Sequence, residues 1–323
     1  MIIKITKWLL LIIAFKMTTV LIVAQYYTDP RRDTAARKKL CSAFNPNVVF
    51  IGTSRTLYGI DPAVFDSVNQ QKTRSYNFGI FSLSPYSSTQ IADDILSGSP
   101  EVKTIYMELS ALDYSTVALQ PRQVIQDAVF RANVMADCPN IDFHTKAGSF
   151  LDGLNTTLFQ MVSIAPQILS AKKALNPNID PIEGNATLLD NGHQSVTSAL
   201  LKTSDRIIAN KSSTEQMLAT HPPATRNTFY VSQLNKLIAR ARKVGRKVIF
   251  YCPNNITRAE YQILSQVIPF LPDENLIPLP EHSLLDVLFK SENLFDAHHL
   301  NRKGAAIYTR YLQEEAGKRI DRL

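Results

Sequence analysis

The chain has 323 residues, 45% of them hydrophobic and 20% charged, which is the composition of a globular protein long enough for one large domain. Much of the formal net charge of +7 comes from basic residues near the N-terminus that flank an apolar stretch, and no basic stripe alternates with aromatic residues elsewhere. We therefore expect a membrane-proximal basic segment and no nucleic-acid partner.

The apolar segment from Trp8 to Tyr27 is about as long as a helix that spans a bilayer. Aromatic residues at its two ends match the interfacial belts of membrane proteins, while Lys16 in the middle makes insertion less favourable. Because no small-residue cleavage site follows the apolar core, residues 1–27 are predicted to be an uncleaved signal anchor, a transmembrane helix. A cleaved signal peptide is the alternative.

The orientation of this anchor depends on the basic residues around it. Lys4 and Lys7 precede the span, and a larger basic group follows it between Arg31 and Lys39. A strict positive-inside count would keep the large domain in the cytoplasm, but long C-terminal domains often cross the membrane behind an N-terminal anchor. We expect a single-pass membrane protein whose large domain is extracytoplasmic.

Residues 28–45 are predicted to form a juxtamembrane linker that leads into a helix, and residues 46–323 to form one α/β domain. The first part of this domain alternates short apolar runs with helical patterns. The runs predict buried strands over Val48–Ile51, Ser75–Ile80 and Val102–Leu109. One helical pattern begins at Pro62, and a second covers Ser84–Gly98.

Residues 116–224 interrupt this alternation, because they contain helix-like stretches and polar breaks without a clear strand. They are predicted to be a helical insertion. The elements expected after them are a helix over Phe229–Gly245, a strand over Lys247–Pro253, a helix from Arg258, a short apolar segment over Leu276–Pro280 and a last helix near Gly304–Glu315.

Strands that alternate with helices indicate a three-layer α/β sandwich with a central, mostly parallel sheet. In such sheets, ligands bind at the carboxyl ends of the strands. Ser54, Gly79 and Ser110 each follow or end a predicted strand. These residues therefore mark the expected position of a site.

A serine hydroxyl is a weak nucleophile unless a base removes its proton and a third group orients that base. Asp296 and His299 stand three residues apart, just before a helix that Asn301 is predicted to cap, so the carboxylate can reach the imidazole within one turn. His298 is the alternative base, but the spacing favours His299. Each residue also has a structural explanation, since a serine after a strand and a glycine is ordinarily a turn residue, and Asp296 could cap a helix.

Three short blocks, "FIGTSR", "YNFGI" and "DAHHLNRKG", resemble successive blocks of the SGNH (GDSL-like) hydrolase superfamily. The variant "GTSR", together with an N-terminal anchor, is similar to the membrane-anchored branch, whose members transfer or remove acyl groups on cell-envelope polymers, as in D-alanyl transfer. The resemblance implies an SGNH/flavodoxin-like fold and a serine hydrolase without a metal or organic cofactor. The three blocks lie in the α/β parts of the chain on either side of the predicted insertion, and none lies within it.

The resemblance also implies roles for individual residues. Ser54 would be the nucleophile, His299 the general base and then acid, and Asp296 the carboxylate that orients it. Backbone N–H groups of Ser54 and Gly79 would form the oxyanion hole. The superfamily's third block supplies an asparagine after the third strand, whereas this chain has "YMELSALDY" there, so Asn77 is considered as a substitute donor.

The remaining candidates have both functional and structural explanations. Arg55 could bind an anionic substrate or form a salt bridge, and the salt bridge is favoured. Glu108 and Asp113 could form a catalytic carboxylate pair, but no second motif supports this, and capping or solvation is preferred. Cysteines with metal-ligand spacing are absent, so no metal site is predicted.

The sequence thus predicts a membrane-anchored serine esterase or O-acyltransferase that acts on acylated carbohydrate or another cell-envelope polymer. The alternative is a catalytically inactive module of the same fold that binds or assembles a polymer. A lipid-handling hydrolase would suit the anchor but gains no support from an extended apolar surface stretch. The acyl group, the acceptor and any protein partner stay open, as does the choice between hydrolysis and transfer.

Overall fold

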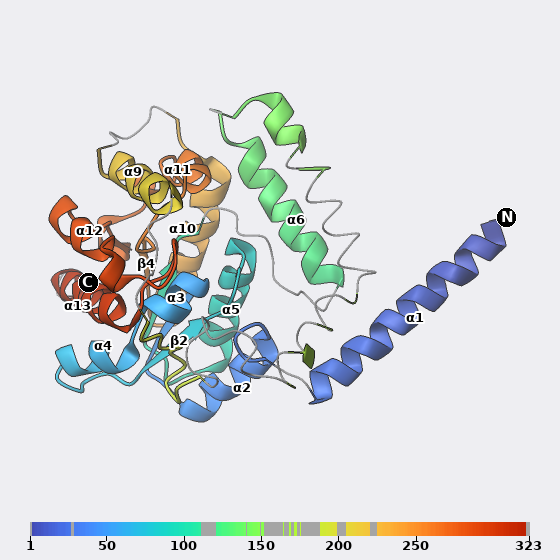
Figure 1. Cartoon of the computed structure of the whole chain (residues 1–323), viewed down its shortest axis with the longest axis horizontal. Helices are drawn as coiled ribbons and strands as arrows, with labels where there is room; N and C mark the ends of the chain where they lie inside the picture. The colour runs from blue at the N-terminus through green and yellow to red at the C-terminus, as the bar shows by residue number, and fades with distance from the viewer. Residues whose placement is uncertain are drawn as a thin grey trace.

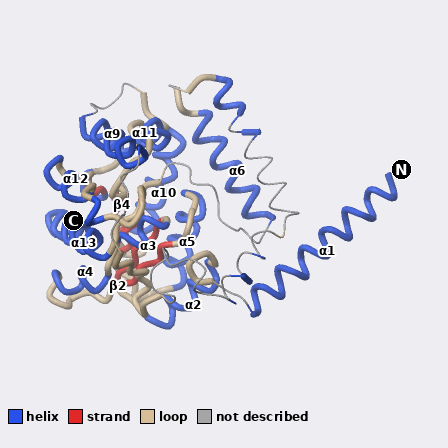
Figure 2. Tube along the Cα trace, in the orientation of Figure 1, coloured by secondary structure: helices blue, strands red, loops and turns tan. Residues whose placement is uncertain are grey.

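A computed structural model gives the fold of the chain (Figures 1 and 2). It describes residues 2–26, 29–110, 121–139, 141–148, 150–151, 188–198, 205–219 and 225–320, together with residues 164, 168, 171–172 and 175. Figure 2 shows the strands gathered at the centre with helices around them. The chain is therefore an α/β protein, as the alternation of strands and helices predicts.

The sheet has five strands in the order β2-β1-β3-β4-β5, and every pair is parallel. This order belongs to doubly wound sheets, in which the chain first moves toward one edge and then toward the other. The strands are β1 (Val48–Gly52), β2 (Ser75–Gly79), β3 (Thr104–Glu108), β4 (Lys247–Tyr251) and β5 (Leu276–Ile277). The register places Gly52 beside Gly79 and Glu108 beside Tyr251, so these residues share the carboxyl edge.

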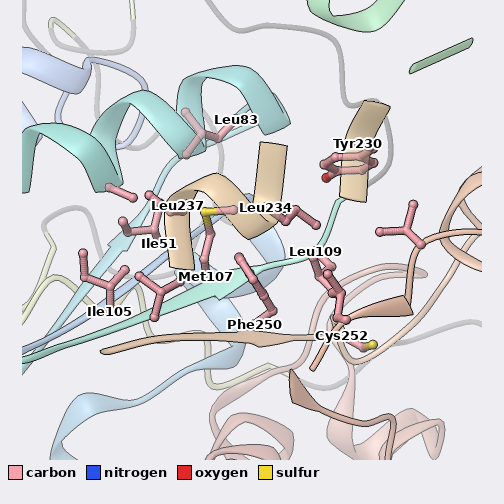
Figure 3. Close-up of a cluster of buried hydrophobic side chains, with 14 of the residues drawn as sticks. Ile51, Leu83, Ile105, Met107, Leu109, Tyr230, Leu234, Leu237, Phe250 and Cys252 are labelled. Atoms are coloured by element: carbon pink, nitrogen blue, oxygen red, sulfur yellow. The ribbon is translucent and has the colours of Figure 1, made fainter. Parts of the chain in front are cut away.

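In β1, β3, β4 and β5, alternate residues belong to two separate hydrophobic clusters, one on each face of the sheet, whereas β2 contributes Tyr76 and Phe78 to one cluster only. Ile51, Met107 and Phe250 pack with Leu234 and Leu237 of a helix on one face, as Figure 3 shows. The other face contributes Phe50, Tyr106 and Ile249 to a cluster with Phe65 and Tyr308. Because both faces are covered, the strands are largely buried and carry short apolar runs, which is why they were visible in the sequence.

The helices that cover the sheet agree with the predicted ones to within a few residues, except that the last helix is longer. The first face carries α5 (Pro85–Gly98) and α10 (Thr228–Lys243), and the second carries α4 (Pro62–Val68) and α13 (Arg302–Ile320). Side chains cap several of these helices. Ser84 Oγ accepts the Ser87 N–H at 3.1 Å, and Asn301 Oδ1 accepts the Lys303 N–H at 3.0 Å.

The helix α1 (Ile2–Tyr26) extends away from the sheet and its helices (Figure 1). Within it, Ile3–Ile22 has a mean hydropathy of 1.8 over 20 residues, and most of its large apolar side chains are exposed. The helix is therefore long and apolar enough to cross a membrane. A signal sequence has the same length and composition, so its role as an anchor stays a prediction. The helix α2 (Thr34–Phe44) follows, within the predicted linker.

The region predicted as an insertion, residues 116–224, is described only in part. Its described parts include the helices α6 (Pro121–Ala136) and α9 (Asp205–Ala219) and the segment 188–198. This segment packs on the sheet domain, because Asn191 O accepts the Asn77 N–H at 2.8 Å and Leu57 O accepts the Gln194 N–H at 3.1 Å. Residues 188–198 thus lie beside the edge strand β2 and against the chain around Leu57.

Candidate active site

Ser54 begins a short helix directly after β1. Thr53 caps this helix, α3 (Ser54–Gly59), through its Oγ1, which accepts the Arg55 N–H at 3.2 Å. Only glycine fits at position 52, since a Cβ there would overlap the Thr56 hydroxyl and the Glu108 carboxylate. From Val48 to Ile60, Ser54 is the one residue that is not buried. The strand and its glycine therefore hold a serine side chain at the surface of the carboxyl edge.

The structure brings Ser54, His299 and Asp296 into one chain of hydrogen bonds. Ser54 Oγ lies 2.7 Å from His299 Nε2, and His299 Nδ1 lies 2.7 Å from Asp296 Oδ2. An ionised carboxylate only accepts hydrogen bonds, so the neutral imidazole carries its proton on Nδ1 and leaves Nε2 to accept the serine hydroxyl proton. This is the arrangement in which a histidine can act as a base toward a serine.

Asp296 is kept ionised by the loop in which it lies. Its half-buried position opposes the charge, but hydrogen bonds from the His299 ring and from the backbone N–H groups of His298 and His299 outweigh that cost and lower the pKa of Asp296. The Asp-x-x-His spacing makes all three bonds local. The carboxylate thus fixes the backbone of the loop and the imidazole together.

The His299 ring is also held by aromatic packing. Phe295 stacks on it with ring centroids 5.4 Å apart and an interplanar angle of 12°, and Tyr58 meets it edge-on at 5.1 Å. The Phe295 N–H donates to His299 O at 3.1 Å, which closes the loop between η5 (Ser291–Asn293) and α13. Tyr58 comes from α3, so the helix that begins with Ser54 also orients the imidazole.

His298 does not face Ser54 in this structure. Its Nδ1 lies 3.1 Å from Asn210 Nδ2 of α9, and its backbone oxygen accepts a bond from Asn255 Nδ2 at 2.7 Å. Burial and the neighbouring His299 lower the pKa of His298. Of the two adjacent histidines, only His299 bonds to the serine, which is the geometry that the spacing favours.

The predicted oxyanion donors lie elsewhere than expected. The Gly79 N–H donates to Asn77 Oδ1 at 2.8 Å, and Asn77 Nδ2 donates to the backbone oxygens of Thr56 and Ile60, each at 2.7 Å. Both donors are therefore committed inside the protein, which contradicts the prediction for Gly79 and Asn77. A Cβ at Gly79 would overlap the Leu57 backbone, so close packing explains this glycine.

The backbone N–H of Ser54 remains in place for the predicted role. It lies in the first turn of α3, where helix geometry provides no partner for an N–H. Helix geometry therefore leaves the Ser54 N–H without a partner in its own helix, whereas the Gly79 N–H and the Asn77 amide are bonded inside the protein. No further oxyanion donor is identified among the described residues.

Arg55 is buried and pairs with carboxylates, so it does not reach toward a substrate. Its Nη2 lies 3.0 Å from Glu108 Oε1 and 2.6 Å from Glu260 Oε1. Glu108 also accepts bonds from the Thr53 N–H and hydroxyl, each at 2.9 Å. The salt-bridge interpretation of Arg55 is confirmed, and the substrate-binding one is wrong. Glu108 is a support of the serine segment, and Asp113 lies outside the described residues.

Comparison with known proteins adds nothing to this geometry, because no family model, no curated protein and no solved structure matches the chain. The resemblance to the SGNH superfamily therefore stays a prediction that rests on the three sequence blocks. The contacts around Ser54 are the evidence for a site.

Within the described part of the chain, no group of three or more histidine, cysteine, aspartate or glutamate side chains is placed to hold a metal ion. The three cysteines are free and buried, and burial raises the pKa of both Cys41 and Cys252 to about 12. Thiols with such pKa values are poor nucleophiles at neutral pH. Ser54, by contrast, has the imidazole of His299 beside its hydroxyl.

Proposed function

We propose that the chain is a membrane-anchored serine esterase or O-acyltransferase of SGNH type, acting on acylated carbohydrate or another cell-envelope polymer. The observation that carries the proposal is the hydrogen-bonded chain from Ser54 Oγ through His299 to Asp296, at the carboxyl edge of a parallel sheet. The residues on both sides of Ser54, 48–53 and 55–60, are buried, so Ser54 is the residue of this segment that a substrate can reach.

The chemistry follows from the positions of the protons. His299 Nε2 removes the Ser54 hydroxyl proton as Oγ attacks the ester carbonyl, and the Ser54 backbone N–H donates to the oxygen on which negative charge develops. His299 then gives the proton to the departing alcohol, which leaves an acyl-serine. Water or an acceptor hydroxyl attacks this ester after losing its proton to His299, and Ser54 recovers its hydrogen. Water yields hydrolysis, and an acceptor hydroxyl yields transfer.

The substrate class rests on two further features. The apolar helix α1 would hold the domain beside a membrane, where envelope polymers are modified. The resemblance of the sequence blocks is to the branch that handles acyl groups on such polymers. Neither feature specifies the acyl group.

The proposal is tested by turnover with the detergent-solubilised full chain. We expect hydrolysis of p-nitrophenyl acetate and release of acetate from an acetylated polysaccharide, and we expect Ser54→Ala to abolish both. Ser110→Ala is the matched control, since Ser110 also follows a strand at the carboxyl edge and is buried, with its backbone oxygen bonded to Tyr230. A Ser54→Ala variant with wild-type turnover would contradict the proposal.

A second function is favoured by one observation, the commitment of the Gly79 N–H to Asn77. With a weakened oxyanion hole, the same fold would serve as a polymer-binding or assembly module without turnover. In that case the folded chain would bind the acetylated polysaccharide, and Ser54→Ala would leave the binding unchanged. Binding with no acetate release would favour this second function.

A further inference from the structure

Asn255 contacts the segments on both sides of the Ser54–His299 hydrogen bond. It lies in the loop after β4 and is completely buried. Its backbone oxygen accepts a bond from Arg55 Nη1 at 3.1 Å, and its Nδ2 donates to the backbone oxygen of His298 at 2.7 Å. Arg55 follows Ser54 in the chain, and His298 precedes His299. Asn255 thus contacts the neighbours of both reacting residues: its backbone bonds to Arg55, and its side chain bonds to His298.

The Arg55 end of this span is fixed by buried carboxylates. Glu260 Oε1 and Oε2 accept bonds from Arg55 Nη2 and Nη1 at 2.6 and 2.9 Å, a bidentate pairing that orients the guanidinium. Glu260 is itself held by a capping box with Thr257 at the start of α11 (Arg258–Leu264). Burial opposes its charge, but the pairing with Arg55 keeps the pKa of Glu260 below its ordinary value. Arg55 is therefore a rigid support.

The His298 end has fewer supports. The loop is held by the local bonds to Asp296 and by Asn210 Nδ2, which donates to Ala297 O at 3.0 Å. Neither of these bonds connects the loop to the serine segment. Tyr58 of α3 reaches the loop through aromatic packing on the His299 ring, and Asn255 adds a hydrogen-bonded connection to the loop backbone through its bond to His298 O.

We propose that Asn255 is a positioning residue, which sets the separation between Ser54 Oγ and His299 Nε2 by tying the histidine loop to the Arg55 side chain. The inference rests on the proposed function. Asn255 does not bond to Ser54, His299 or Asp296 directly, so it acts through the backbone of its neighbours. Proton transfer from serine to histidine requires hydrogen-bond distance, and a displacement near 1 Å can lower a rate by about a hundredfold.

The test uses the detergent-solubilised full chain and two readouts: the rate constant for labelling by a fluorophosphonate probe, and kcat and KM for p-nitrophenyl acetate. Asn255→Ala is expected to slow labelling by roughly tenfold to a hundredfold and to lower kcat with KM unchanged. The matched control is Asn275→Ala. Asn275 is also buried and donates its Nδ2 to a backbone oxygen, that of Val248, at 2.8 Å, but at the opposite edge of the sheet. It should leave both readouts unchanged.

A second variant covers the case in which Asn255→Ala does not fold. Asn255→Leu keeps nearly the size of the side chain and the backbone acceptor for Arg55, adds no buried charge, and removes the donor to His298 O. It should show the same loss of kcat in a chain whose circular dichroism matches that of the wild type. A third variant, Arg55→Lys, removes the bidentate fork. If the two residues act through one connection, the loss of kcat in the double variant Arg55→Lys/Asn255→Ala should be smaller than the two single losses combined.

The outcomes separate this inference from the proposed function. Wild type that labels at Ser54, with folded Asn255 variants that label equally fast, would overturn the positioning role and leave the proposed function standing. Equal losses in Asn255→Ala and Asn275→Ala would also overturn it, because general destabilisation would then explain the effect. Wild type that never labels at Ser54 would overturn the proposed function, and the inference with it.

Discussion

Ser54 lies on a segment held by residues far away in the sequence, whereas Asp296 and His299 lie in a loop held largely by its own hydrogen bonds. The serine side depends on Arg55 and on Glu108 and Glu260, which are separated from Arg55 by 53 and 205 positions. On the histidine side, one carboxylate accepts bonds within three residues. One half of the site is therefore built locally, while the other half requires the whole fold.

The largest effect expected on the histidine side is that of Asp296→Asn. An amide can donate to His299 Nδ1, which moves the ring proton to Nε2 and removes the acceptor for the Ser54 hydroxyl. We expect kcat for p-nitrophenyl acetate to fall by about 10⁴-fold. The control is Asp66→Asn, since Asp66 also accepts a backbone N–H, that of Ser75, at the opposite edge of the sheet. An Asp296→Asn variant that keeps most of its turnover would show that the local hydrogen bonds of the loop do not orient His299 for catalysis.

This loop was also the part of the site that the sequence predicted best. The Asp-x-x-His spacing is local, and Asn301 caps α13 as its position before that helix indicates. The buried strands were visible because both faces of the sheet are covered. By contrast, α3 was not predicted, because its six residues are too few for helical periodicity and its start depends on Thr53 and Glu108.

The support of the serine side could not be predicted as a whole. The bond from the Gly79 N–H to Asn77 depends on how Asn77 turns inside the fold, which no spacing encodes. Glu260 is the one of these supports that has a sequence signal, since the Thr257-x-x-Glu260 pattern before a helix is that of a capping box. That pattern indicates where Glu260 lies, but not that Arg55 is its partner.

On the serine side, Arg55→Met is expected to lower the free energy of unfolding strongly. The substitution leaves the carboxylates of Glu108 and Glu260 buried without their cation, a change that costs about 3–5 kcal/mol. Arg240→Met is the control, because Arg240 pairs with Asp93 at the surface and should cost less than about 1 kcal/mol. Equal losses in urea unfolding of the solubilised chain would refute the structural importance of the buried pairs.

Gly79→Ala tests whether position 79 requires glycine because the Leu57 backbone packs closely against it. Alanine keeps the backbone N–H but adds a Cβ that overlaps the Leu57 backbone, so we expect a destabilisation of about 1–3 kcal/mol. Gly98→Ala provides the comparison, since nothing lies within 4 Å of a Cβ at that position. If the Gly79→Ala variant were as stable as the wild type, close packing against Leu57 would not explain the glycine at this position.

The segment 188–198 beside the serine helix predicts a dependence of stability on pH. Burial lowers the pKa of His193 below its ordinary value of 6.5, against the opposing charge of Asp61, so the folded chain holds this ring neutral while the unfolded chain protonates it. Stability should therefore fall as the pH drops below about 6.5, by at most about 1.4 kcal/mol per pH unit for one group.

His193→Gln should reduce this slope, because glutamine can still donate to the Tyr58 backbone oxygen and does not titrate. Urea unfolding at neutral and mildly acidic pH measures the difference. His298, whose pKa burial also lowers, contributes a slope of the same sign that remains in the variant. A slope unchanged by His193→Gln would show that His193 is not the buried neutral group.

The activation of Ser54 by His299 is tested by locating the adduct that a fluorophosphonate probe forms on the chain. The solubilised full chain would be labelled, digested and mapped by mass spectrometry, with His299→Ala alongside. The account predicts one adduct, on the Ser54 hydroxyl, that is lost in His299→Ala. An adduct on another serine, or one on Ser54 that forms equally fast without His299, would contradict it.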